Sequence, residues 1–258
     1  MNDASPLRGK RVLITRPAQQ AEELAQALRT AGAEPIVAPA IEIGPPDDPA
    51  ALRASVARAR TYDWVVFTSR NGVEALFTAA RAREPLDRSA SPFGDARVAA
   101  IGPKTADALA LRGVRVDLIP PSFVGEAVAA ELLARTQSSA RVLLYRAQDG
   151  RETIPETLRA HGRVVDVVAA YATTPVRDPS LREKAARADV VTFASASAVD
   201  GFARNVPDPG RLLRTKTVAA IGPVTAKAAR AAGIRVDAVA AEFTVDGLLD
   251  ALAAAASS

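Results

Sequence analysis

The chain has 258 residues, of which 48% are hydrophobic and 24% charged, and its formal net charge at pH 7 is +4. These values are those of ordinary globular proteins and exclude disordered and fibrous classes, while the length allows one large domain or two of about 125 residues. Because the sequence has no cysteine and one histidine, His161, disulfide scaffolds, thiolate zinc sites and iron–sulfur clusters are excluded. Multi-histidine metal sites and catalytic triads are disfavoured.

The predicted elements, taken in chain order, are short strands that alternate with helices. The strands are almost continuously apolar, as is typical of strands buried on both faces of a sheet. The helices between them have proline in the first turn or glycine just past the end. This alternation predicts an α/β fold with parallel sheets flanked by helices. The predicted strands are 12–15, 35–38, 64–67, 98–101, 115–119, 142–145, 164–168, 190–193, 218–221 and 235–239.

The chain contains an internal repeat. The segment 98–106 recurs as 218–226 with eight of nine residues identical, at an offset of 218 − 98 = 120. The strand segments 63–69 and 11–16 recur, in the second half of the chain, at 189–195 and 141–146. The repeated segments keep the same order in both halves, which indicates a duplication. It predicts two similar α/β domains, each with a five-stranded parallel sheet.

Two extended, proline-containing segments follow the second strand of each copy. They are 38–46 and 170–176, and they act as links. Links at the same place in both copies fit either a simple tandem or a chain that crosses twice between the domains. The residues alone leave both arrangements open.

Polar loops follow the carboxyl ends of the predicted strands, where open parallel sheets bind their ligands. They combine Ser, Thr, Gly and Arg with helix N-termini, which favour anions. For any single Ser or Thr, helix capping is the alternative, but together the loops would line a cleft between the domains. Known phosphate-binding glycine loops are missing. The loops are 16–18, 68–72, 102–105, 146–151, 194–197 and 222–225.

Three further residues have structural interpretations. Asp149 and Glu152 are expected to pair with the nearby arginines Arg146 and Arg151 or to cap a helix, and His161 is expected to cap a helix C-terminus. Tyr171 lies in the second link. It is either a packed linker aromatic or a hydroxyl donor that faces the ligand.

Composition and charge also restrict the partners. No apolar run approaches the ~18 residues needed to cross a bilayer, and arginines interrupt the N-terminal stretch that a signal peptide would need. We therefore expect a cytoplasmic protein with no membrane contact. With seven Phe, three Tyr, one Trp and no dense basic run, nucleic acid is not an expected partner. Of the 33 cations, 28 are arginines, which suit a small anionic ligand, although codon bias also explains them.

Taken together, these motifs resemble the uroporphyrinogen-III synthase family. The resemblance extends from Arg11 to about Leu252. Each motif is short, and their order and spacing carry the resemblance. The two copies differ at one position of the motif 100–105, where Lys104 stands in the first copy and Val224 in the second. The motifs are 12–17, 66–73, 100–105, 146–151, 170–175, 193–197 and 220–225.

The resemblance implies an exchanged domain arrangement. One domain would combine residues 1–40 with 175–258, the other would span 45–170, and 41–44 with 171–174 would be the links. The active site would lie in the cleft between the domains. The resemblance also implies neither cofactor nor metal. No coiled coil or long apolar edge argues against a monomer, so we expect a monomer that makes a transient contact with the upstream deaminase.

The implied reaction is the cyclisation of hydroxymethylbilane in haem, sirohaem and cobalamin biosynthesis. The linear tetrapyrrole loses water, the resulting azafulvene is attacked at the substituted carbon of ring D, and a spirocyclic pyrrolenine fragments and recloses with ring D inverted. Tyr171 would assist departure of the hydroxyl. The substrate carboxylates and pyrroles would be held by Arg16, Ser69, Asn71, Thr105, Arg146, Arg151, Ser195, Ser197 and Thr225.

Two other functions remain open at this point. One is a catalytically silent tetrapyrrole- or anion-binding module of the same fold, which loss of Tyr171 and the twinned threonines would have favoured. The other is an unrelated tandem sugar- or nucleotide-binding α/β protein, which a glycine-rich phosphate loop would have favoured.

Overall fold

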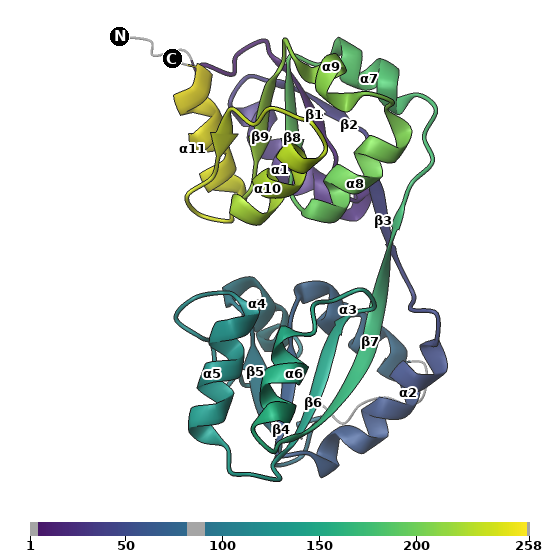
Figure 1. The fold of residues 1–258 in the computed structure, drawn as a ribbon, viewed down its shortest axis with the longest axis vertical. Coiled ribbons are helices and arrows are strands. Elements are labelled where there is room, and N and C mark those ends of the chain that lie inside the picture. Colours follow the sequence, from purple (N-terminus) through teal and green to yellow (C-terminus); the bar gives the residue numbers. More distant parts are fainter. Residues whose placement is uncertain (1–4, 82–90, 257–258) are drawn as a thin grey trace. The chain divides into compact units, whose positions relative to one another are not determined.

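The chain contributes two separate segments to one α/β unit and a continuous segment to the other. The computed structural model, shown in Figure 1, describes residues 5–81 and 91–256. Within that range, unit 1 is formed by parts of Met1–Ile43 and Thr174–Ser258, and unit 2 by parts of Gly44–Thr173. Each unit has its own five-stranded sheet and its own buried residues.

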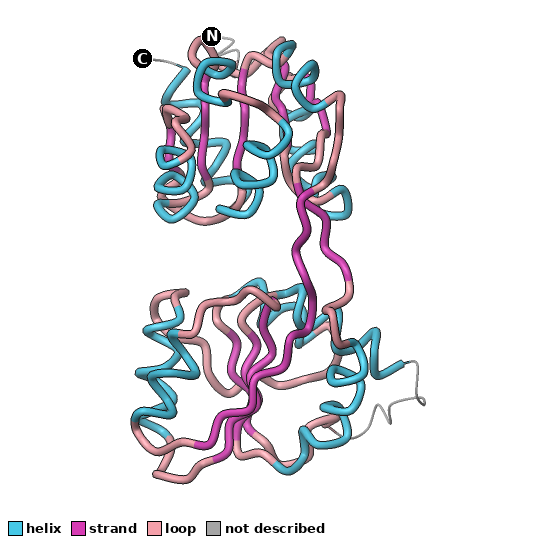
Figure 2. Tube along the Cα trace, turned by 45° about the vertical axis from the view of Figure 1, so that its right-hand side comes forward, coloured by secondary structure: helices cyan, strands magenta, loops and turns pink. Residues whose placement is uncertain are grey.

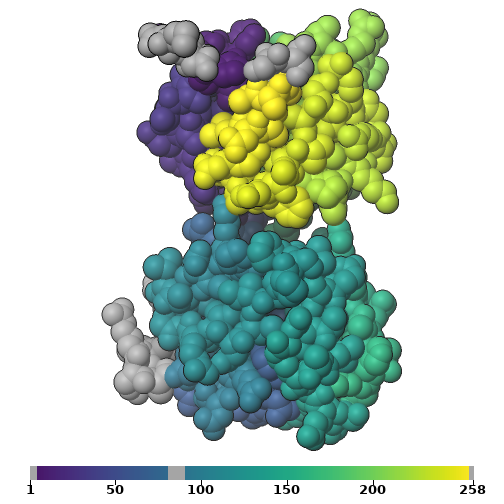
Figure 3. All heavy atoms as spheres, turned by 90° about the vertical axis from the view of Figure 1, so that its left-hand side faces the viewer, coloured from purple at the N-terminus to yellow at the C-terminus, as the bar shows by residue number. Residues whose placement is uncertain are grey.

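The sheet of unit 1 has the order β10-β9-β8-β1-β2, and its four strand pairs are parallel. Side chains alternate between its faces: Val12 and Ile14 pack with α1 and α11, whereas Leu13 packs with α7, α8 and α10. Figure 3 shows α11, in yellow, on the surface of this unit. The elements are β1 (Arg11–Ile14), α1 (Ala18–Thr30), β2 (Glu34–Val37), α7 (Leu181–Arg187), β8 (Val190–Phe193), α8 (Ala196–Asn205), α9 (Pro209–Leu213), β9 (Thr217–Ala220), α10 (Pro223–Ala231), β10 (Ala238–Val239) and α11 (Val245–Ala256).

The second sheet has the order β3-β7-β6-β4-β5, and the pairs β4–β5, β4–β6 and β6–β7 are parallel. It belongs to unit 2, except that Ile41–Ile43 of β3 and the last two residues of β7 are counted with unit 1. Helices α2, α3 and α4 cover one face, and α5 and α6 cover the other. Figure 2 shows the strands of each sheet, in magenta, between helices in cyan. The elements are β3 (Ile41–Gly44), α2 (Pro49–Arg58), the 3₁₀ turn η1 (Ala59–Thr61), β4 (Trp64–Phe67), α3 (Arg70–Arg81), β5 (Arg97–Ala100), α4 (Pro103–Ala110), α5 (Gly125–Arg135), β6 (Arg141–Ala147), α6 (Thr153–Ala160) and β7 (Val164–Pro175).

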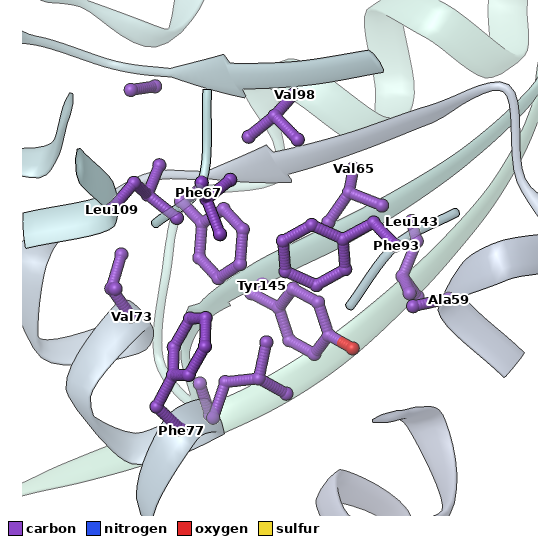
Figure 4. Packing of buried hydrophobic residues seen from close by; sticks show 14 of the residues in the cluster. Ala59, Val65, Phe67, Val73, Phe77, Phe93, Val98, Leu109, Leu143 and Tyr145 are labelled. Atoms are coloured by element: carbon purple, nitrogen blue, oxygen red, sulfur yellow. The ribbon is translucent and has the colours of Figure 1, made fainter. Parts of the chain in front are cut away.

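Aromatic rings fill the core of unit 2 beneath α2 and α3, as Figure 4 shows. The Phe67 and Tyr145 rings stack with centroids 5.1 Å apart, and Phe93 packs against Phe67 at 5.8 Å. The Tyr145 hydroxyl lies 2.9 Å from Ser55 Oγ, which itself donates to the Leu52 carbonyl. Burial raises the pKa of Tyr145, so this hydroxyl stays neutral and serves packing.

The predicted α/β class with two five-stranded, mostly parallel sheets is confirmed, but two predicted strands are wrong for most of their length. The segment 235–239 is a strand only at Ala238–Val239 (β10), and 115–119 forms no named strand. In 115–119, an isolated bridge joins Leu118 to Ala99, and β3 is the fifth strand of that sheet instead. The segment lies at the edge of the sheet, where Arg115, Asp117 and Ile119 are exposed, and the N–H groups of Asp117 and Leu118 both donate to the Val98 carbonyl instead of forming a regular ladder.

The strand predicted at 164–168 is longer than expected. It continues as β7 to Pro175, so the positions expected in the second link belong to a strand. Among the described residues, no helix is long and apolar enough to span a membrane.

Candidate functional site

In unit 2, the turn between β4 and α3 lies against β7. Ser69 Oγ accepts a hydrogen bond of 3.1 Å from the Gly72 N–H and so caps α3. A Cβ on Gly72 would lie 3.5 Å from Ser69 Oγ and 3.8 Å from the Ala170 Cβ. Asn71 occupies the first turn of α3, beside Gly72. This turn, with Ser69 and Asn71, is therefore next to the residue that precedes Tyr171.

Tyr171 follows a β-bulge in β7. The register pairs Arg146 with Ala169 but Ala147 with Tyr171, so Ala170 is the extra residue. Bulges change the direction in which a side chain points. The Tyr171 ring is half-buried against the aromatic core, and the structure gives its hydroxyl no hydrogen-bond partner within residues 5–81 and 91–256. The phenol is thus held by packing and its hydroxyl is available to a ligand.

Gln148 fixes the backbone of the bulge and was missed by sequence reasoning. Its N–H donates to the Tyr171 carbonyl at 2.8 Å. Its side-chain amide accepts from the Asp47 N–H at 2.8 Å and donates to Asp47 Oδ2 at 2.7 Å. The only sequence signal was the position of Gln148 inside the predicted strand-end loop 146–151.

The loop after β6 is folded around the Arg146 guanidinium. Arg146 donates to the carbonyls of Gly150 and Arg151 and to the Glu152 carboxylate. The predicted pairing of Glu152 with an arginine is confirmed, whereas Asp149 is exposed and makes no such pair in the described structure. Arg151 is exposed and its side chain has no hydrogen-bond partner among the described residues. Within the part of the chain that the structure describes, Arg151 therefore has a guanidinium without a partner, and Arg146 has a buried Nε that lacks a hydrogen-bond partner.

The twinned threonines are not helix caps. The N-caps of α4 and α10 are Gly102 and Gly222, which have no side chain to cap with. Thr105 and Thr225 lie inside the first turn of these helices, and each is only 4% exposed. The capping alternative is therefore wrong for this pair.

In unit 1, Ser195 has the capping role that Ser69 has in unit 2. Ser195 Oγ accepts from the Ala198 N–H at 3.1 Å and lies 3.0 Å from Ser197 Oγ. Both serines are half-buried at the start of α8. Capping uses one lone pair of Ser195, so the pair of hydroxyls can still donate to a ligand.

Arg16 is the second residue after β1 and is only 8% exposed. Its Nε is buried with no hydrogen-bond partner among the described residues, and burial lowers the pKa of the guanidinium. The preceding Thr15 donates to the Thr192 carbonyl at 2.7 Å, which ties the end of β1 to β8. Burying a guanidinium nitrogen without a hydrogen-bond acceptor destabilises the fold unless an anion accepts the bond. Arg16 is therefore suited to bind a carboxylate.

The expected site residues therefore divide between the units, and in each unit they lie toward the carboxyl ends of parallel strands. The described residues contain no group of three or more His, Asp or Glu side chains that could hold a metal ion. The predicted cap at His161 is confirmed, since its Nδ1 lies 2.8 Å from the Thr157 carbonyl at the end of α6. Unit 2 carries Ser69, Asn71, Thr105, Arg146, Arg151 and Tyr171, and unit 1 carries Arg16, Ser195, Ser197 and Thr225.

Each of the two α/β units has a parallel sheet with hydroxyls and arginines at its strand ends. This is a two-unit α/β protein suited to an anionic ligand. A family model described as Uroporphyrinogen-III synthase HemD matches residues 22–250. The chain belongs to the uroporphyrinogen-III synthase family.

Known proteins of this family are similar over nearly the whole chain. A uroporphyrinogen-III synthase of Synechococcus elongatus is 34% identical over 96% of both chains. A porphyrin biosynthesis protein HemD of Ruminiclostridium josui is 31% identical over 96% of this chain and 49% of its own length. Among solved structures, a mutant uroporphyrinogen III synthase of Thermus thermophilus shares the fold with a TM-score of 0.67 at 20% identity, covering 96% of this chain and 98% of that one.

Proposed function

We propose that this chain closes hydroxymethylbilane to uroporphyrinogen III, with loss of water and inversion of ring D, in tetrapyrrole biosynthesis. The observation that carries the proposal is membership of the uroporphyrinogen-III synthase family over residues 22–250. The residues at the strand ends support it, because they offer hydrogen-bond donors and cations to a polycarboxylate substrate.

Substrate binding is assigned to the residues whose donors are available. The buried Nε of Arg16 lacks a partner among the described residues, and Arg151 is exposed, so both suit the acetate and propionate side chains of the bilane. Ser195 with Ser197, and Ser69, add neutral donors, and Asn71, Thr105 and Thr225 are assigned to the same site by their match to the family motifs. Arg146 reaches the substrate only if it gives up a contact within its own loop.

Tyr171 is assigned the departure of the hydroxymethyl hydroxyl. Its phenol protonates that oxygen as the carbon–oxygen bond breaks, so that water leaves, and the phenolate is neutralised by the proton that the pyrrole N–H gives up. The pyrrole nitrogen supplies the electron pair that forms the azafulvene. The substituted carbon of ring D then attacks, and the spirocyclic pyrrolenine fragments and recloses. Because the substrate supplies the electrons, the protein contributes mainly orientation, and no cofactor or metal is part of this proposal.

The setting is proposed on the same basis. The protein acts in the cytoplasm as a monomer and receives its substrate, through a transient contact, from the deaminase that makes hydroxymethylbilane. Membership of the family supports these statements. Sedimentation of the pure protein with and without that deaminase tests the monomer and the contact, and cell fractionation tests the location.

The isomer ratio of the product tests the activity. Freshly made hydroxymethylbilane closes spontaneously to the type I ring, so we expect the protein to give an excess of type III and the heat-denatured protein to give none. Type I alone would contradict the proposal. Type I alone together with tight binding of the bilane would favour the silent binding module instead.

A further inference from the structure

Two phenylalanines are half exposed, and they occupy the same position in the two copies of the repeat. Phe123 is 50% exposed and Phe243 is 51% exposed, and they are separated by 120 residues, the offset of the repeated Gly-Pro-x-Thr segment. The remaining five phenylalanines are at most 5% exposed: Phe67, Phe77, Phe93, Phe193 and Phe202. Exposure of the same large apolar residue in both copies is a cost that packing alone does not explain.

Each exposed ring lies on the glycine that caps the neighbouring helix. A Cβ on Gly102 would come within 3.2 Å of Phe123 Cγ, and a Cβ on Gly222 within 2.8 Å of Phe243 Cε1. Both glycines have extended backbone, with φ of −169° and 178°, so their conformation does not require glycine. The missing side chain is what lets the rings lie against the turns.

The turns under these rings lead directly to the buried threonines of the candidate site. Gly102 starts the helix that contains Thr105, and Gly222 starts the helix that contains Thr225. A second apolar pair follows the same offset, since Ile119 is 45% exposed and Val239 is 38% exposed. Each unit thus places an open aromatic face beside a helix N-terminus that favours a carboxylate.

A pyrrole ring with acetate and propionate substituents combines the same two features, a flat apolar ring and carboxylates at its rim. We propose that Phe123 and Phe243 each pack against a pyrrole ring of the bilane while the adjacent helix N-terminus receives a carboxylate of that ring. This inference rests on the proposed function. It adds two positioning residues that contact substrate through an apolar face.

Truncation of the rings tests the inference. We expect Phe123→Ala and Phe243→Ala each to raise KM for hydroxymethylbilane about threefold to tenfold with little change in kcat. Tryptophan in place of either phenylalanine should keep KM near the wild-type value, because it retains a flat aromatic face. The fluorescence of the introduced tryptophan should be quenched when uroporphyrinogen III is added. Leu111→Ala is the matched control, because Leu111 is 86% exposed at the end of α4 and should leave KM unchanged. Folded alanine variants with wild-type KM would overturn the inference.

A double-mutant cycle separates the rings from the fold. Gly222→Ala forces the Phe243 ring to move, so we expect KM to rise as in Phe243→Ala, with no further rise in the double variant. Additive effects would show that the ring does not mediate the effect and would contradict the inference. If alanine at 123 or 243 prevents folding, leucine keeps the apolar contact without the flat face and should still raise KM. Failure of the wild type to form type III would refute the proposed function instead, so the two failures are distinguishable.

Discussion

At the residue scale, the position of Tyr171 depends on a single extra residue in β7. The bulge at Ala170 shifts the register, and Gln148 holds the Tyr171 carbonyl. Without the extra residue Ala170, the Tyr171 side chain would point to the opposite face of the sheet. The hydroxyl is thus placed by backbone geometry rather than by a hydrogen bond of its own.

Tyr171→Phe removes the hydroxyl and keeps the ring that packs on the core. We expect kcat to fall roughly a hundredfold with a modest change in KM, because the leaving hydroxyl loses its donor. Tyr62→Phe is the matched control: Tyr62 donates to Asp166 at the amino ends of β4 and β7, so its loss should leave kcat unchanged. Turnover of Tyr171→Phe at the wild-type rate would remove Tyr171 from its assigned role.

The sequence predicted the types of residue at the site better than their contacts. Hydroxyls after strands were expected, but only the fold separates the caps Ser69 and Ser195 from the buried Thr105 and Thr225. Arg146 could not be distinguished from Arg151 because its partners include loop carbonyls. Such contacts depend on backbone path and have no residue signature.

At the element scale, both copies of the repeat have an aspartate that accepts a backbone hydrogen bond at the amino end of a neighbouring strand. Asp189 accepts from the Arg11 N–H at 2.9 Å and pairs with the Arg11 guanidinium. In unit 2, Asp63 accepts from the Arg141 N–H at 2.7 Å. Each aspartate thereby joins the beginnings of neighbouring central strands. Hydrogen bonds from Arg11 lower the pKa of Asp189 to about 2.

Asp189→Asn should therefore lower the free energy of unfolding at pH 7 by roughly 1 kcal/mol, a value that allows for solvent screening of this half-exposed pair. Because the folded pKa lies below the unfolded value of about 3.9, the stabilisation is complete above that pH and is lost as pH falls toward about 2. Urea unfolding of wild type and variant should give a constant difference from pH 7 to pH 5 and a smaller one at pH 3. A difference that grows as the pH falls would contradict this assignment.

Most strands were predictable because they are short apolar runs buried on both faces, such as Trp64–Phe67 and Val190–Phe193, which begin and end at the expected residues. The segment 115–119 also contains apolar residues, but the N–H groups of Asp117 and Leu118 share the Val98 carbonyl, so no regular ladder forms. The segment that forms β3 is flanked by prolines, which indicated a link. It is a strand because it pairs with β7. Pairing partners distant in the sequence decided these two cases.

At the scale of the whole molecule, unit 1 is built from strands that are not all consecutive in the chain, whereas the strands of unit 2 follow one another. Unit 1 joins β1 and β2 with β8, β9 and β10, and the chain divides between Ile43 and Gly44 and between Thr173 and Thr174. The residues of the links do not specify which strands pair, so the residues alone left a tandem and an exchanged arrangement open. The candidate residues of both units are assigned to one substrate.

The twinned threonines test that assignment most directly, because each unit has one and neither is a helix cap. Thr105→Val and Thr225→Val keep the buried shape and remove the hydroxyl, whereas Thr→Ser at either position keeps the hydroxyl. The account predicts that each valine variant, folded as judged by its unfolding curve, forms type III product about tenfold more slowly, and that the serine variants stay near the wild-type rate. A wild-type rate for the valine variant of either unit would contradict the claim that both units act on the bilane.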